Sequence, residues 1–478
     1  MKDILEPYLS PLISCNRSIK TLSLRLYVHI CKSPHWFAIS VLGALCYLVS
    51  LLLYPTIQCT GRYPETKIHL DTAVGNFSNT KGAPSDKWRP LLVSSCEGLH
   101  SRSAPCLQEH QNGSNIIGAQ EVIYMPFTLK LPSFINESQR KEWINATKVS
   151  NFRAILEDSK DFAVYSTQYG QNLVFKNTGY FGNPKADIWS DTSCMGQSVP
   201  HVQFLDEKNS SDAHEAILLA TSPDSWSWQH FLDRVTTLWA QAMLIMNQED
   251  ISKVEIVSGN RPGQVVNELY DLLGVKHLHQ VEQIEAKRLF FSCRTPLIHP
   301  FNIQKINEIL GVKSYPPHQR KVVLMMSRDD ENLQRHILNQ NELDTRVTSL
   351  LESRNKGEVF VPFKLNEFNK VEDIIKYISA NVKMIISPHG GALLNARFAS
   401  SSTAILEFMP RGRYRSVFWE QTHTLDQDYH VYFLDSLDAS HNMKLDNLDE
   451  VIAWIDSILD SIDSQKPPRV IPQYQWNV

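Results

Sequence analysis

The chain has 478 residues, of which 42% are hydrophobic, 10% aromatic and 21% charged. This length suits two domains of ordinary size, and this composition is that of a folded globular protein. The formal net charge of −4 and the lack of any long Lys/Arg run exclude the basic face that nucleic-acid binding needs, so we expect no nucleic-acid partner.

One apolar segment near the start of the chain predicts a membrane anchor. Residues 36–54, WFAISVLGALCYLVSLLLY, carry no charge and match the roughly 20 residues that span a bilayer. A cleaved signal peptide is disfavoured because residues 1–35 precede the segment and its apolar core is long; a buried core helix is the other alternative. Five Lys and Arg residues before the span place residues 1–35 in the cytoplasm, which predicts a single-pass type II protein with a lumenal remainder.

The segment after the span carries features that fit a lumenal location. The eight cysteines show neither CxxC pairs nor the His/Cys spacing of zinc sites, so no structural metal site is predicted. Four of them are candidates for disulfides in an oxidising compartment: Cys96, Cys106, Cys194 and Cys293. Sequons for N-glycosylation occur at Asn76, Asn112, Asn136, Asn145 and Asn209.

Beyond the anchor the chain divides into a stem and two α/β regions. Residues 55–115 are rich in Ser, Thr, Gly, Pro and Asn, which is typical of a stem or linker. Residues 116–300 alternate apolar runs with amphipathic stretches, such as a predicted helix at 231–246 and a strand at 254–257, which predicts an α/β domain with a mainly parallel sheet.

Residues 301–440 repeat this pattern more clearly. We predict strands at 322–326, 384–387 and 404–408, helices at 333–351 and 371–380, and a further helix that starts near Ala392. The two regions together predict two Rossmann-like domains with a cleft between them. An amphipathic helix at 448–462, within the tail at 441–478, is expected to pack back across both halves.

The segment MIISPHGGALLNARF, residues 384–398, predicts a strand that runs through a glycine turn into a helix. Ligands of open α/β sheets bind at the carboxyl ends of strands, where a helix N-terminus offers unpaired N–H groups to a diphosphate. Gly390 and Gly391 would allow close approach, and His389 would donate a hydrogen bond to the diphosphate or to the leaving oxygen. The alternative is a Gly-Gly turn that only links strand to helix. We assign to the diphosphate site His389, Gly390, Gly391, Ala392 and Asn395.

Charged residues near other strand ends add to this site. Arg328 follows the strand at 322–326, and Arg335, Asn339 and Glu342 have the spacing of one helix face. Arginines bind phosphate bidentately and neutralise charge on a leaving diphosphate, although a solvated surface helix is the alternative. Glu407, in the strand at 404–408, would bind a ribose diol if it is not a surface charge.

A candidate general base lies in the first half, in the segment WQHFLDR at residues 228–234. His230 and Asp233 are three residues apart at the predicted start of a helix. Either would deprotonate an attacking hydroxyl group. An Asp near a helix start is also favoured by the helix dipole alone, so a structural role is the alternative.

Taken in this order, these segments resemble glycosyltransferase family 61. The resemblance rests on QHFLDRVT from Gln229, FSCRTPLIHP from Phe291, the series from Arg328 to Glu342, PHGGALLN from Pro388 and ILEFMP from Ile405. The family typically has His-Gly-Ala-Gly where this chain has His-Gly-Gly-Ala at residues 389–392. Glycine at the third position still permits phosphate approach, and the change leaves the fine donor geometry open.

The resemblance implies a GT-B-like fold and an inverting transferase of the Golgi membrane, with residues 116–300 on the acceptor side and residues 301–440 binding the nucleotide sugar. The chain looks most like the N-glycan β-1,2-xylosyltransferases, which implies UDP-xylose as donor and the core mannose of N-glycans as acceptor. The alternatives are protein O-GlcNAc transfer from UDP-GlcNAc, pentose transfer to a polysaccharide, and a non-catalytic lumenal glycan-binding protein.

No essential cofactor or metal is expected. No DxD motif lies in a convincing strand-end loop, and Asp329-Asp330 is the nearest acidic pair. Mn2+ dependence remains the alternative. An anchored hydrolase is disfavoured because the chain has neither a GxSxG motif nor a carboxylate pair with evident partners.

Overall fold

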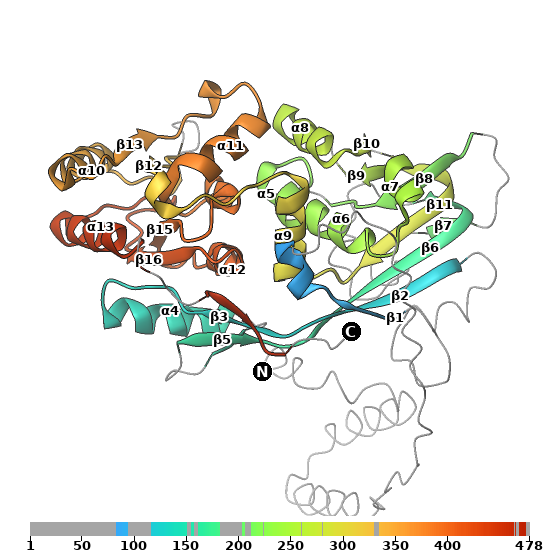
Figure 1. Cartoon of the computed structure of the whole chain (residues 1–478), viewed down its shortest axis with the longest axis horizontal. Coiled ribbons are helices and arrows are strands. Elements are labelled where there is room, and N and C mark those ends of the chain that lie inside the picture. The colour runs from blue at the N-terminus through green and yellow to red at the C-terminus, as the bar shows by residue number, and fades with distance from the viewer. Residues whose placement is uncertain are drawn as a thin grey trace, which may run out of the picture. The chain divides into compact units, whose positions relative to one another are not determined.

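The described residues form a mixed α/β fold with three sheets, one of them entirely parallel (Figure 1). The computed structural model describes residues 83–93, 116–150, 154–156, 161–181, 203–205, 212–222, 224–259, 261–279, 281–328, 334–462, 464 and 468–474, all within one compact unit, His69–Val478. The predicted anchor at 36–54, most of the predicted stem, three sequons (Asn76, Asn112 and Asn209) and Asp329-Asp330 lie outside these residues. In the part that is described, no helix is both long enough and apolar enough to cross a bilayer.

The C-terminal sheet has five parallel strands in the order β13-β12-β14-β15-β16. Their bounds are β12 Val322–Met325, β13 Val359–Pro362, β14 Val382–Pro388, β15 Ala404–Pro410 and β16 Asp428–Leu434. Strands β14 and β15 are buried along their whole length, as expected for a parallel sheet that is covered on both faces. In chain order this is the 2-1-3-4-5 arrangement, whose topological switch point lies between β12 and β14.

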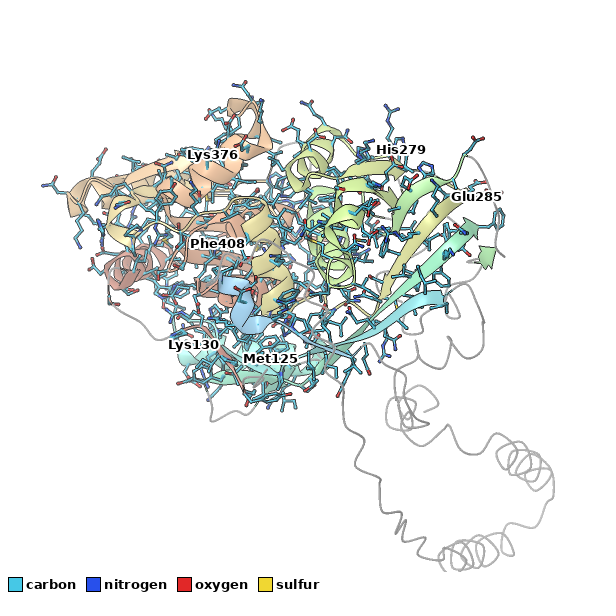
Figure 2. All side chains as sticks on the ribbon, turned by 45° about the vertical axis from the view of Figure 1, so that its right-hand side comes forward. Met125, Lys130, His279, Glu285, Lys376 and Phe408 are labelled. Carbon is cyan, nitrogen blue, oxygen red and sulfur yellow. The ribbon has the colours of Figure 1, made fainter. Side chains whose placement is uncertain are left out.

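Helices cover both faces of this sheet. The helices α10 (Gln340–Arg354) and α13 (Leu448–Ile462) pack on one face, and α11 (Val371–Asn381), the 3-10 helix η9 (Gly391–Phe398) and α12 (Val417–Thr424) pack on the other. In Figure 2, Phe408 of β15 lies within this core, whereas Lys376 of α11 is exposed at the surface. The predicted position of α13 across the two halves is wrong, because its apolar side chains pack with α10 and the C-terminal sheet.

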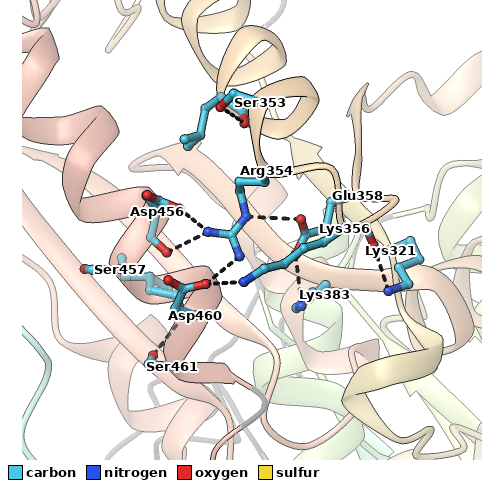
Figure 3. Close-up of polar contacts among 12 residues, drawn as sticks. Lys321, Ser353, Arg354, Lys356, Glu358, Lys383, Asp456, Ser457, Asp460 and Ser461 are labelled. Carbon is cyan, nitrogen blue, oxygen red and sulfur yellow. Dashed lines mark hydrogen bonds and ion pairs between the residues drawn. The ribbon is translucent and has the colours of Figure 1, made fainter.

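An ion-pair network holds α10 and α13 together on their face of this sheet (Figure 3). Arg354 of α10 bonds to Asp456 and to Asp460 of α13 and, at 3.1 Å, to Glu358. Lys383 at the start of β14 lies 3.0 Å from the other oxygen of Glu358, whose side chain is fully buried. Glu358 therefore links α10 to the start of β14, and Arg354 links both of them to α13.

The first sheet has the order β1-β2-β6-β11-β8-β9-β10, with β7 paired to β6. Its strands are β1 Leu91–Val93, β2 Ile116–Tyr124, β6 Gln168–Phe181, β7 Gln203–Leu205, β8 His214–Leu219, β9 Val254–Ser258, β10 Lys276–His279 and β11 Gln283–Cys293. Only β11, β8, β9 and β10 are parallel neighbours, and the other pairings are antiparallel. The prediction of a mainly parallel sheet for residues 116–300 is therefore wrong for β2, β6 and β7, which pair antiparallel.

A third, antiparallel sheet joins the last strand of the described residues to strands from the predicted first domain. Its order is β17 (Val470–Pro472), β3 (Phe127–Lys130), β5 (Phe162–Tyr165) and β4 (Ala154–Leu156), and helix α4 (Glu137–Ser150) follows β3. Trp419 Nε1 of α12 donates a 2.8 Å hydrogen bond to the carbonyl of Lys130, and Ser133 forms a bridge with His430 of β16. This part of the predicted first domain thus packs against the C-terminal half, as Figure 1 shows.

The helices of the first half lie between the two larger sheets and share their core. They are α6 (Thr236–Ala242), α7 (Gln248–Lys253), α8 (Gln264–Leu273) and α9 (Pro300–Ile309), with the short helix α5 (Trp228–His230) and a π-helical turn at Phe231–Val235 before α6. Predicted elements at 254–257, 322–326, 371–380, 384–387, 404–408 and 448–462 are confirmed within a few residues. The helix predicted at 333–351 begins only at Gln340.

Candidate functional site

A cavity of about 810 Å3 lies at the carboxyl ends of β12, β13 and β14, where helices of the first half face the C-terminal sheet. This is the volume range of small-molecule sites, and the place is the switch point where open α/β sheets bind ligands. The lining residues are Ser227, Trp228, Gln229, His230, Val265, Ser327, Arg328, Arg335, Phe363, Lys364, Leu365, Asn366, Ile374, Gly391, Ala392 and Asn395.

The turn after β14 is built around Arg328. Gly390 has φ of 172°, an extended conformation that any residue adopts, so backbone strain does not require glycine here. A Cβ atom at this position, however, would collide with Nη1 of Arg328. Gly390 therefore makes room for an arginine side chain, whereas we had expected it to allow phosphate approach to the backbone. Gly391, Ala392 and Asn395 of η9 line the cavity, and their binding of a diphosphate stays a prediction.

Three arginines concentrate positive charge at this site. The pKa of Arg335 is lowered to about 10, first by burial and then by the charges of Arg328 and Arg413, while Glu407 opposes the shift. Arg335 Nε is buried and has no hydrogen-bond acceptor among the described residues. Arg413 follows β15, in the basic run RGRYR that begins directly after the strand; this strand-end position was the signal by which the sequence could have revealed it.

Arg335 is held by a long-range backbone pairing and not by a helix. Its φ is +61°, and its N–H donates a 3.0 Å hydrogen bond to the carbonyl of Ser440. A non-glycine residue in this region is strained, which is common at ligand sites. The structure thus separates Arg335 from the helix face that its spacing predicted.

Asn339 and Glu342 do not line the cavity, so their predicted role in donor binding is corrected. Asn339 precedes α10 and exchanges hydrogen bonds of 2.9 Å with the backbone of Leu445, which fixes the loop that carries Arg335. Glu342 is exposed in the first turn of α10, where a carboxylate is favoured by the helix dipole.

Glu407 also differs from its predicted role as a ribose ligand. It is fully buried, and its two carboxylate oxygens bond to His389 Nδ1 and to the Tyr429 hydroxyl. Burial, and then the charge of Glu407, raise the pKa of Tyr429 well above 10, so the hydroxyl stays a donor. Because a carboxylate only accepts, Nδ1 of His389 carries a proton and the ring orientation is fixed. His389 is 95% buried and is not a cavity-lining residue.

The opposite wall carries His230, whose side chain is 31% exposed. The hydroxyl of Ser227 caps this short helix by accepting from the His230 backbone N–H. Nδ1 of His230 is buried and lies 3.5 Å from Oδ1 of Asp233, which is itself buried and does not line the cavity. Of the two predicted candidates for the base, His230 is therefore the one that a ligand can reach, and Asp233 lies behind it.

Asp233 also faces a buried cation. Arg397 of η9 is fully buried, donates to the carbonyl of Leu232 and has its pKa lowered to about 10 by burial, an effect that the charge of Asp233 opposes. Asp233 occupies the π-helical turn at Phe231–Val235, an irregularity that is frequent at functional sites.

One end of the cavity is apolar. Val265 at the start of α8, Phe363 after β13 and Ile374 of α11 form this part of the lining, with Lys364, Leu365 and Asn366 beside them. An apolar surface with a few polar groups is the usual lining of a small-molecule site.

Further predicted features fall partly within the described residues. Asn136 and Asn145 both have exposed side chains, and Asn145 lies within α4. Cys293 is disulfide-bonded, and every other cysteine lies outside the described residues. Over the described ranges, no group of three or more His, Cys, Asp or Glu side chains is arranged to hold a metal ion.

Comparisons with known proteins identify the region that contains this site. Residues 228–406 match the family model Glycosyltransferase 61, so this part of the chain is similar to glycosyltransferase family 61. No curated protein matches the chain. A solved structure of a flavo di-iron protein mutant from Thermotoga maritima is 16% identical over 42% of this chain and 47% of its own, with a TM-score of 0.23, which carries no argument about fold or function.

Proposed function

We propose that the domain at residues 228–406 transfers xylose from UDP-xylose, with inversion, in β-1,2 linkage to the core mannose of N-glycans. The observation that carries the proposal is the placement of Arg328 and Arg335 on one wall of a single cavity and of His230 on the other. A partly buried cationic cluster is suited to a diphosphate, and a reachable imidazole is suited to a hydroxyl group.

The proposed reaction is a single displacement. The acceptor oxygen attacks the anomeric carbon of the donor sugar, and the bond from that carbon to the β-phosphate oxygen breaks with its electron pair remaining on UDP. The hydroxyl proton moves to Nε2 of His230, while Asp233 holds the ring through Nδ1 and stabilises the imidazolium. Arg328, Arg335 and Arg413 stabilise the charge that develops on the diphosphate.

His389 would assist from the side of the leaving group. Its Nδ1 donates to Glu407, so Nε2 donates to the diphosphate in the imidazolium form, in which both ring nitrogens carry a proton. We propose that the apolar end near Phe363 and Ile374 receives the uracil, and that the two α/β parts around the cavity correspond to the halves of a GT-B-like fold.

The same proposal places the enzyme in the Golgi membrane as a single-pass type II protein. The uncharged segment at 36–54, the five preceding basic residues and the lumenal sequons support this location. The disulfide at Cys293 fits an oxidising compartment. We further propose that transfer needs no metal, which predicts that activity survives excess EDTA; complete loss that Mn2+ restores would overturn this part.

The full-length chain, incubated with a panel of UDP-sugars and a mixture of N-glycan and peptide acceptors, tests the proposal through UDP release and product mass. A pentose increment on the N-glycan supports it. An N-acetylhexosamine increment on a peptide would keep the family and replace the substrate, and a pentose on a polysaccharide would do the same. Nucleotide binding without transfer from any donor would favour a non-catalytic glycan-binding protein.

A further inference from the structure

The chain segment directly before the short helix of His230 is a rigid turn. The N–H of Ser227 donates to the carbonyl of Asp224 at 3.0 Å, and the Ser227 hydroxyl donates to the same oxygen at 3.1 Å. Arg234, from the π-helical turn, donates from Nη1 to Ser222 Oγ at 3.1 Å and to Asp224 Oδ2 at 3.4 Å. The turn is therefore fixed to the same element that carries Asp233.

This turn lies against the reachable nitrogen of His230. Oδ2 of Asp224 is 3.9 Å from Nε2 of His230, whereas the other ring nitrogen is buried against Asp233. Asp224 is about half exposed, with 47% of its side chain accessible. A hydroxyl group that gives its proton to Nε2 must consequently sit beside Asp224, within reach of its carboxylate.

The same turn presents an exposed tryptophan. The side chain of Trp226 is 53% exposed, although both Ser227 and Trp228 next to it line the cavity. A single exposed apolar residue is ordinary, but a tryptophan on a hydrogen-bonded turn beside a candidate base is a specific combination. The face of an indole carries negative charge density, and the C–H face of a sugar ring carries positive hydrogens, so the two surfaces attract.

We propose that the turn Asp224–Ser227 is the acceptor subsite, in which the indole of Trp226 stacks on the sugar ring that bears the attacking hydroxyl. Asp224 accepts a hydrogen bond from a neighbouring hydroxyl group of that ring. The ligand is a neutral pyranose of a glycan, since the turn offers an aromatic face and a carboxylate, and its cation, Arg234, is already bonded to that carboxylate and to Ser222. This inference rests on the proposed function, because His230 defines where the acceptor oxygen lies.

Acceptor kinetics of the full-length chain test the subsite. We expect Trp226→Ala to raise the KM for an N-glycan core oligosaccharide by about tenfold or more, with the KM for the UDP-sugar unchanged. Trp226→Phe keeps an aromatic face and restores most of the affinity. Phe181→Ala, which removes a comparably exposed aromatic residue at the end of β6, is the matched control and leaves both KM values unchanged. Equal acceptor KM values for Trp226→Ala and Phe181→Ala overturn the subsite.

A binding measurement separates this inference from the proposed function. Calorimetry with saturating UDP measures the affinity of the same oligosaccharide without turnover. Loss of glycan binding in Trp226→Ala, with UDP affinity retained, supports the subsite even if the wild-type chain transfers no sugar. Glycan affinity equal to that of the wild type, or no glycan binding by the wild type, overturns it.

Discussion

Gly390→Ala is expected to inactivate the enzyme by displacing Arg328 while leaving the fold intact. The backbone at Gly390 is extended, so alanine adopts it without strain. The added Cβ collides with Nη1 of Arg328, the end of a flexible side chain, which moves away at little cost in folding free energy. The guanidinium then no longer reaches the diphosphate. Loss of one charge-stabilising donor lowers kcat by roughly 10²-fold, or about 2.7 kcal/mol of transition-state stabilisation.

Four variants measured together make this prediction decisive. The assay compares kcat for UDP release with the thermal midpoint of unfolding. Gly263→Ala is the control, because a Cβ there meets no atom within 4 Å, and it should keep both values close to wild type. Arg328→Ala should match the loss of Gly390→Ala, and the double variant should be no worse than either, since both remove one interaction. Wild-type kcat in a folded Gly390→Ala chain refutes the placement of Arg328, and additive losses refute the shared cause.

Three further predictions follow from buried charges. Glu358→Gln should lower the free energy of unfolding by about 3 kcal/mol, because it removes the buried carboxylate that pairs with both Arg354 and Lys383. Burial raises the pKa of Glu358, but hydrogen bonds from these two cations outweigh it and lower the pKa below 4.5. The wild-type stabilisation is therefore present at neutral pH and is lost as the pH falls through the folded-state pKa. The affinity for UDP, measured by calorimetry, should fall as the pH rises through about 10, where Arg335 loses its charge. If the UDP affinity of Arg335→Gln fell over the same pH range, the assignment to Arg335 would be contradicted. Asp233→Asn should reduce kcat by roughly 10²-fold or more with little change in donor KM, because the amide no longer stabilises the imidazolium of His230. A kcat close to that of the wild type would exclude a catalytic role for the pair of Asp233 and His230.

The parallel half of the fold was predictable because its strands carry their own signal. Strands such as β14 and β15 are short, continuous apolar runs, and the Gly-Gly turn marks where β14 ends. The antiparallel strands β2 and β6 lack this signal, because they bury polar side chains. Asn172 donates to Gln120 Oε1 at 2.9 Å and to the carbonyl of Gln241 at 3.0 Å, and such internal hydrogen bonds replace the apolar pattern on which strand prediction depends.

Some site residues could be placed from their local sequence, whereas the positions of others depend on long-range contacts. His230, Arg328 and Gly391 lie next to elements that the local sequence defines, and all three line the cavity. The helix-face argument for Asn339 failed because this residue pairs with Leu445, about a hundred positions away, and no periodicity reveals that contact. Glu407 was misassigned for a related reason: β15 lies beside β14, and this neighbour supplies His389 as its partner.

Arg397 connects the turn after β14 with the segment that carries His230 and Asp233, although the two lie in different halves of the described chain. It lies in η9, the helix whose first turn lines the cavity, and it donates to the carbonyl of Leu232 in the π-helical turn. Its Nε also donates, at 3.2 Å, to Asn307 of α9, so one buried guanidinium spans three elements from both halves. Burial of this cation is unfavourable, and the nearby charge of Asp233 offsets part of the cost. Because Asp233 also lies 3.5 Å from His230, one buried pair of charges connects the helix that carries His230 with the turn after β14.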